Sequence, residues 1–101
     1  MSPIQTNLEE IVRLCRRYQV RRLAAFGSIL RPDFDTLRSD ADFLVEFEPV
    51  PVAIRMQNYL ALRQALASML ARSVDLIEEG AIQNPYILQS VARQQQILYA
   101  A

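Results

Sequence analysis

Histidine, tryptophan and lysine are absent from the 101-residue sequence, and cysteine occurs only once. Without histidine the chain has no imidazole base and no His/Cys zinc site, and a lone Cys15 cannot form an intramolecular disulfide. No apolar run approaches the roughly 20 residues of a membrane span, and the first ten residues lack the apolar segment of a signal peptide. We therefore expect a cytoplasmic protein with no membrane partner.

Neither positive nor negative charge is in excess, because eleven arginines balance eleven acidic residues to a formal net charge of zero. Direct nucleic-acid binding depends on basic surfaces that neutralise phosphates, so this balance argues against it. A hydrophobic share of 51% with only two glycines and five prolines excludes a disordered or low-complexity chain. The length predicts a single domain, residues 1–101, with one core.

Apolar residues recur at spacings of three and four, the period of amphipathic helices, in three segments. Leu8 to Tyr18 is the first, with Asn7 as the expected N-cap. Ala53 to Leu70 is the longest, and its expected apolar face consists of Ile54, Leu60, Leu62, Leu66, Met69 and Leu70. The tail from Pro85 to Arg93 suits a third helix with three inward residues, Tyr86, Leu88 and Val91.

Short apolar runs bounded by turn residues predict the strands. Val20 to Phe26 reads as a buried strand, and Ala41 to Glu46 alternates between an apolar and a mixed face before two prolines. Val74 to Ile77 is a third strand, whereas residues 97–99 suit either a last short strand or a helix end. This order of elements predicts an α/β (α+β) fold, a small mixed sheet of three to four strands covered by helices.

Gly27 and Ser28 directly follow the first expected strand. Backbone N–H groups at the start of such a loop form a phosphate cradle, in which glycine lets the backbone approach the ligand and serine adds a hydroxyl donor. The same pair also suits a plain turn with a helix N-cap. By itself it does not distinguish a binding loop from a structural one.

Three aspartates are more informative. Asp40 and Asp42 are two residues apart, so a strand places both carboxylates on one face, where they repel unless a cation lies between them. Asp75 interrupts an apolar strand and must be paired, metal-bound or in water at a strand end. If the two strands are neighbours, the three carboxylates form the ligand set of a two-metal phosphoryl-transfer site, for which Mg²⁺ is suited. The structural alternatives are a capping turn at Asp40, a solvated Asp42 and a strand-edge Asp75.

The combination of these motifs resembles the minimal nucleotidyltransferases, small members of the polymerase-beta-like nucleotidyltransferase superfamily. The resemblance covers nearly the whole chain and rests, in order, on Phe26-Gly27-Ser28, Arg31, the segment Ser39 to Val45 and the segment Val74 to Ile77. One departure is Pro32, because the family usually has glycine after the arginine. The gap between the Gly-Ser pair and the Asp-x-Asp motif is also one residue longer than usual.

The resemblance implies a role for each matching residue. Gly27, Ser28 and Arg31 would bind the nucleotide triphosphate. Asp40 and Asp42 would bind Mg²⁺, and Asp75 would be the third catalytic carboxylate and metal ligand, near the attacking hydroxyl.

Family members of this size are commonly antitoxins encoded beside a HEPN-domain ribonuclease toxin, and they transfer AMP from ATP to a tyrosine of that toxin. The resemblance thus implies ATP as substrate and a HEPN-type toxin as partner, in a homo-oligomer or a hetero-oligomer with the toxin. The alternative is a catalytically silent antitoxin that inhibits by direct binding, which Pro32 slightly favours and the three retained aspartates oppose. A third hypothesis, an operator-binding repressor, rests only on the arginines between positions 13 and 22.

Overall fold

The structure, a computed structural model, describes residues 3–26, 41–81, 83–86, 89, 93 and 95–101. Seven labelled helices and strands lie within these residues. They occur in the order α1 (Pro3–Thr6), α2 (Leu8–Arg17), β1 (Val20–Phe26), β2 (Ala41–Phe47), α3 (Val52–Leu70), β3 (Val74–Glu78) and β4 (Gln96–Ala100). A 3-10 turn, η2 (Glu79–Ala81), follows β3 directly. None of the described helices is long and apolar enough to cross a membrane.

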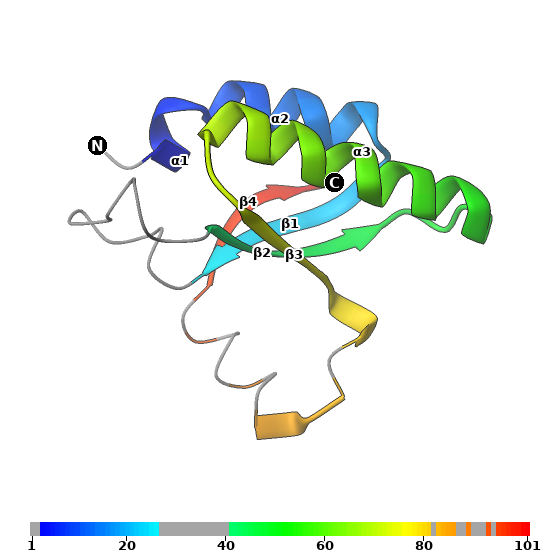
Figure 1. Cartoon of the computed structure of the whole chain (residues 1–101). Helices are drawn as coiled ribbons and strands as arrows, with labels where there is room; N and C mark the ends of the chain where they lie inside the picture. The colour runs from blue at the N-terminus through cyan, green and yellow to red at the C-terminus, as the bar shows by residue number, and fades with distance from the viewer. Residues whose placement is uncertain (1–2, 27–40, 82, 87–88, 90–92, 94) are drawn as a thin grey trace.

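The four strands form one mixed sheet in the order β3-β2-β1-β4 (Figure 1). The central strand β1 is antiparallel to both β2 and β4. β2 and β3 are parallel, and α3 lies in the long crossover connection that a parallel pair needs. The mixed sheet with its helices confirms the predicted fold class, and the segment 97–99 belongs to a last strand.

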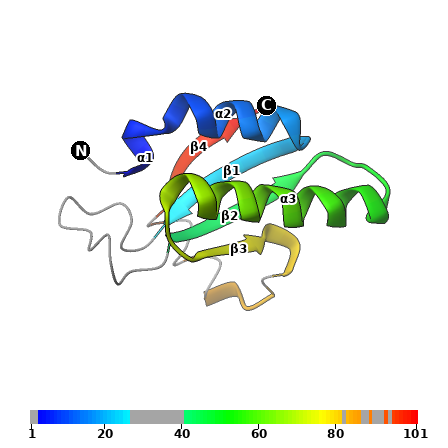
Figure 2. The ribbon, with the colours of Figure 1, turned by 45° about the horizontal axis from the view of Figure 1, so that its top comes forward.

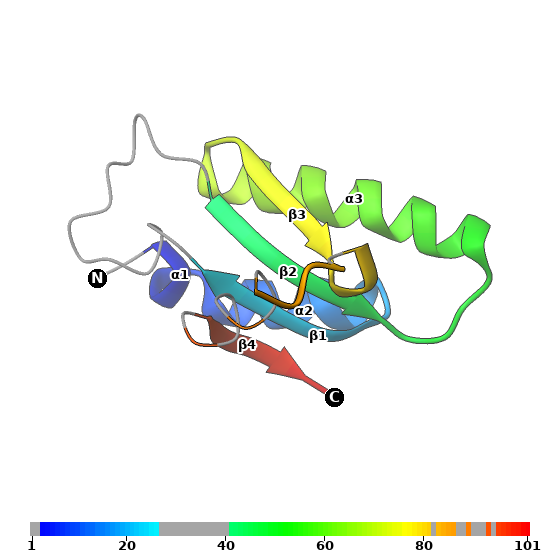
Figure 3. The same ribbon diagram turned by 90° about the horizontal axis from the view of Figure 1, so that it is seen from below.

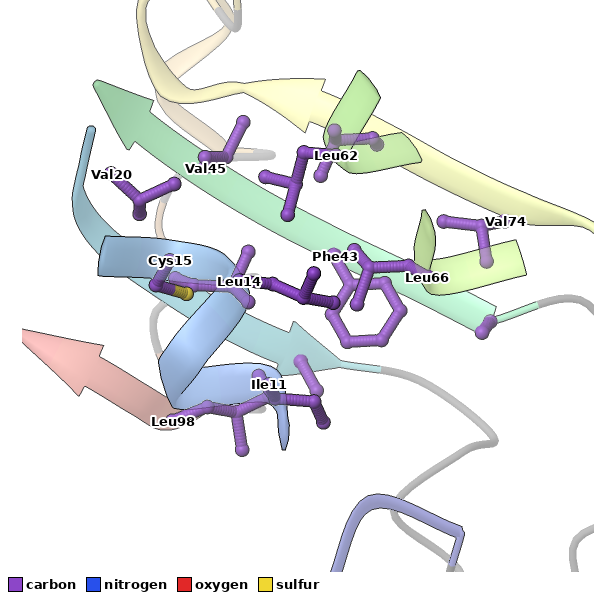
Figure 4. Close-up of a cluster of buried hydrophobic side chains, with 14 of the residues drawn as sticks. Ile11, Leu14, Cys15, Val20, Phe43, Val45, Leu62, Leu66, Val74 and Leu98 are labelled. Carbon is purple, nitrogen blue, oxygen red and sulfur yellow. The ribbon is translucent and has the colours of Figure 1, made fainter. Parts of the chain in front are cut away.

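Helices α2 and α3 both lie on one face of the sheet, where the core is (Figures 1 and 2). Every second residue of β2 points into this core, because side chains of a strand alternate between faces. Phe43 is fully buried there among residues from both helices, as Figure 4 shows. The remaining positions of β2, which include Asp42, therefore point to the opposite face, called the far face below.

The burial of α3 differs from the prediction. Three residues of its C-terminal half, Leu62, Leu66 and Leu70, are buried, whereas Ile54 and Leu60 are 41% and 60% exposed. Apolar residues occur all round this helix, so their spacing did not define one face. Residues 52–57 are all exposed, and Figures 2 and 3 show the first turns of α3 reaching past the sheet.

Two local predictions at the ends of the chain hold only in part. Asn7 is the N-cap residue of α2, as predicted, but its side chain makes no cap hydrogen bond. Its N–H donates to the Ile4 carbonyl of α1, a short helix that the sequence did not predict. Tyr86 does not face inward, because it is 81% exposed. Pro85, Tyr86, Gln89 and Arg93 are helical, while Leu88 and Val91 lie outside the described residues.

Candidate active site

Three residues from three adjacent strands form a row across the sheet. Asp42 of β2 pairs with Phe26, the last residue of β1, on one side and with Asp75 of β3 on the other. Neighbouring strands are about 4.8 Å apart, so the two aspartates lie next to each other. β2 and β3 are thus neighbours in the sheet, which is the condition under which the sequence predicts that these aspartates come together.

The alternation of the two strands places both aspartates on the far face. The residue pairs on either side of them, Ala41 with Val74 and Phe43 with Leu76, are buried in the core beneath the helices. Asp42 is half-buried and Asp75 is exposed. Two carboxylates therefore share a surface that solvent reaches.

The end of α3 sets the register of Asp75. Ala71 ends the helix in the left-handed conformation (φ 54°), and the Arg72 N–H donates to the Ala67 carbonyl at 3.2 Å. The chain reverses there, and β3 begins at Val74, three residues after Ala71. The Ser73 carbonyl accepts the Ala41 N–H at 3.0 Å, which starts the parallel pairing one residue ahead of the aspartates.

Four of the residues predicted to form the site, Gly27, Ser28, Arg31 and Asp40, lie outside the described residues. Two of them adjoin the row in the sequence, since Gly27 follows Phe26 and Asp40 precedes Ala41. From the sequence, Phe26 was expected to end a strand and belongs to the motif that carries the family resemblance, but it was given no role in the site. Its position directly before the Gly-Ser pair was the signal that it borders the site.

Asp42 and Asp75 have the donor chemistry that a hard divalent cation needs. Mg²⁺ prefers oxygen ligands and is commonly held by one or two carboxylates together with phosphate oxygens of a substrate. Within the described ranges no group of three metal-binding side chains occurs. The described pair fits a cation whose remaining ligands come from ATP, water or a residue outside those ranges.

A second acidic cluster lies on the far face at the other end of β2. Glu79 is close to Glu46, and Arg22 of β1 is 3.4 Å from the Glu79 carboxylate. Burial and the hydrogen bond between the side chains of Glu79 and Glu46 raise the pKa of Glu79, and Arg22 opposes this. Glu46 is four residues from Asp42 along the strand, about 13 Å, so this cluster is separate from the aspartate pair.

A mixed sheet with both helices on one face and paired aspartates on the other is an arrangement suited to an enzyme that transfers nucleotidyl groups. The chain belongs to the nucleotidyltransferase domain family, whose sequence profile matches residues 8–98. It is 40% identical over 78 residues to a Methanocaldococcus jannaschii protein provisionally named a protein adenylyltransferase, covering 77% of this chain and 76% of that one. The predicted family and the predicted enzyme class, nucleotidyltransferase, are confirmed.

The chain is also similar to several solved structures. One, described provisionally as a minimal nucleotidyltransferase, superposes with a TM-score of 0.77 at 28% identity, covering 95% of each chain. Another is described as a tri-AMPylated Shewanella oneidensis HEPN toxin in complex with an MNT antitoxin. It has a TM-score of 0.64 at 25% identity, covering 96% of this chain and 72% of the other.

Proposed function

We propose that this nucleotidyltransferase is an antitoxin that transfers AMP from Mg·ATP to a hydroxyl group, that of a tyrosine, on a partner HEPN ribonuclease. The observation that carries the proposal is the placement of Asp42 and Asp75 as neighbours on an accessible face of the sheet. The similarity to an MNT antitoxin solved with its AMPylated toxin supports the choice of acceptor. Modification of the toxin would neutralise it.

Each predicted site residue has a task in this reaction. Asp42 and Asp75, together with Asp40, hold the divalent cation. The phosphates of ATP are held by the backbone at Gly27, by the hydroxyl of Ser28 and by Arg31. A cation bound at the carboxylates supplies positive charge that neutralises the phosphate oxygens as the reaction proceeds.

The transfer itself is a substitution at the α-phosphorus of ATP. The acceptor oxygen forms a bond to that phosphorus while the bond to the bridging oxygen of the β-phosphate breaks, and pyrophosphate leaves. The proton of the acceptor hydroxyl passes to Asp75, which orients the hydroxyl before the attack. Donors that bind the triphosphate stabilise the charge that develops on the leaving group.

The position of Asp75 suits a macromolecular acceptor. It is exposed, and its strand β3 lies at the edge of the sheet. A tyrosine on the surface of another protein can approach such a position without entering a deep pocket. The proposal therefore requires the partner to bring the hydroxyl to the edge of the sheet.

Intact-mass spectrometry of the partner tests the proposal. The HEPN ribonuclease proposed as the partner is incubated with Mg·ATP and about a tenth of an equivalent of this protein. A transferase works substoichiometrically, so the partner should gain one or more AMP units. An antitoxin that acts by direct binding leaves the partner unmodified and inhibits it only at equimolar amounts, and that result would overturn the transfer reaction.

Matched variants assign the reaction to the site. Asp75→Asn should abolish the mass gain while the two proteins still associate, because the substitution removes a charge and keeps the shape. Glu9→Gln changes an exposed acidic residue in the first turn of α2, remote from β3, and should leave the mass gain intact. Equal loss in both variants would show that net charge, and not Asp75, matters.

A further inference from the structure

The backbone of β3 is hydrogen-bonded on both sides, although β3 is an edge strand of the described sheet. Carbonyl groups of successive residues in a strand point to alternate sides. The Ser73 carbonyl points to β2, where it accepts the Ala41 N–H. Because of this alternation, the carbonyls of Val74 and Leu76 both point away from β2, to the outer side of the strand. Unpaired edge groups of this kind need other partners.

Two side chains of α3 supply those partners. The Tyr59 hydroxyl donates to the Leu76 carbonyl at 2.6 Å, and the Arg63 Nε–H donates to the Val74 carbonyl at 3.3 Å. Tyr59 and Arg63 are four residues apart, so they lie on the same side of the helix, one turn from each other. Figure 2 shows α3 running alongside β3.

The two accepting residues, Val74 and Leu76, immediately flank Asp75. β2 holds the inner side of this short stretch through the register pair Asp42 and Asp75, and α3 holds its outer side. A strand that is bonded on one side only is less restrained against twisting about its own axis than a strand bonded on both sides. Such a rotation would swing the Asp75 carboxylate away from Asp42, and bonds on the outer side resist it.

We propose that Tyr59 and Arg63 are positioning residues that hold the Asp75 carboxylate opposite Asp42 for the transfer reaction. The inference rests on the proposed role of Asp75 in that reaction. Neither side chain touches a substrate in this account; both act through the backbone on either side of Asp75. Of the two donors, the Tyr59 hydroxyl has the more defined position, because the Tyr59 ring also packs against the core.

Tyr59→Phe is the first test, because it removes the hydroxyl and keeps the ring. A misplacement of 1 Å costs up to roughly 100-fold in rate, so we expect a loss of kcat on the order of 10-fold with an unchanged KM for ATP. The Mn²⁺ concentration that gives half of the ATP-dependent rise in Tm should increase several-fold. This second readout does not depend on the transfer reaction.

Two comparisons separate positioning from general stabilisation. Arg63→Met removes the donor and keeps an aliphatic stem, whereas Arg63→Lys retains a cationic donor and should recover part of the lost kcat. Tyr86→Phe removes a hydroxyl from a tyrosine that is 81% exposed, and it should leave kcat and the Mn²⁺ midpoint at wild-type values. Tm without ligand reports any loss of stability separately.

A double-variant cycle decides whether Tyr59 acts through Asp75. In the Asp75→Asn background, Tyr59→Phe should have no further effect on the Mn²⁺ midpoint, because residues that act as a unit are not additive. Additive effects, or a wild-type midpoint in Tyr59→Phe, would overturn the inference while the proposed function stands. A wild-type protein that Mn²⁺ and ATP do not stabilise would overturn both.

Discussion

Asp42 and Asp75 are register partners on two parallel strands that are 33 positions apart in the sequence, and both point to the face of the sheet that the helices do not cover. Both carboxylates therefore stand on the same face of the sheet, on neighbouring strands. Like charges at this spacing repel, which favours a cation at the same place. The pair is a site at which metal and nucleotide binding can be measured directly.

Mn²⁺ or Mg²⁺ together with ATP should raise the Tm of the wild-type protein, because a ligand bound only by the native state stabilises it. Asp42→Asn should lose most of this gain. Without ligand, Asp75→Asn should be at least as stable as wild type, since it relieves the repulsion between the pair. A thermal melt in which the metal and ATP shift none of these proteins would contradict the nucleotide site.

The Gly-Ser pair after β1 should act on the triphosphate and not on the fold. A hydrogen bond to a charged phosphate is worth roughly 1.5–3 kcal/mol, so Ser28→Ala should lower transfer by about 10- to 100-fold. Gly27→Val should lower it further, because a branched side chain would stand where the backbone meets the phosphate. Transfer rates under saturating partner measure both; a fully active Gly27→Val would place the phosphates elsewhere.

Most of the fold could be predicted from the sequence because the first three strands are short apolar runs with clear ends, whereas residues 97–99 suited either a strand or a helix end. That Asp75 lies beside Asp42 could be predicted only on the condition that their two strands are neighbours in the sheet. Alternation shows which face of its own strand a residue occupies, but the order of strands depends on how α3 packs across the sheet. The parallel register follows from the helix end at Ala71, whose left-handed backbone no periodicity reveals.

Which side of α3 is buried could not be predicted, because α3 carries apolar residues all round its circumference. Leu60 and Leu66 have the same side chain, yet Leu60 is 60% exposed and Leu66 is fully buried. Which of them meets the core depends on where the sheet ends beneath the helix. The local sequence does not contain this information, so the predicted apolar face is wider than the face that is buried.

These two leucines provide a matched pair for a stability measurement. Leu66→Ala should lower the free energy of unfolding by about 2–5 kcal/mol, because it removes buried apolar atoms and leaves a cavity. Leu60→Ala should change it by only about 0.5 kcal/mol or less, as is usual for surface positions. Denaturant unfolding of both variants checks the expectation, and equal losses would mean that Leu60 is covered in solution.

Cys15 should be chemically silent in the folded protein. It is fully buried in the core, and burial raises the pKa of its thiol to about 12. The reactive species is the thiolate, so a thiol reagent at mildly alkaline pH should label the native protein far more slowly than the unfolded chain. The labelling rate should instead follow the rate of unfolding, and rapid modification under native conditions would contradict the burial of Cys15.

Glu79 should make stability depend on pH in a direction opposite to that of most carboxylates. Its pKa is raised above the ordinary 4.5, first by burial and then by its hydrogen bond with Glu46. The folded protein thus binds this proton more tightly than the unfolded chain, so the stability is present at low pH and is lost as pH rises through the raised pKa. Glu79→Gln mimics the protonated group; it should match wild type near pH 4 and become more stable than wild type toward pH 7. Urea unfolding at several pH values measures this difference, with Glu9→Gln as a control that should show no such trend. A difference that stays constant with pH would mean that Arg22 fully compensates the cost of ionising Glu79.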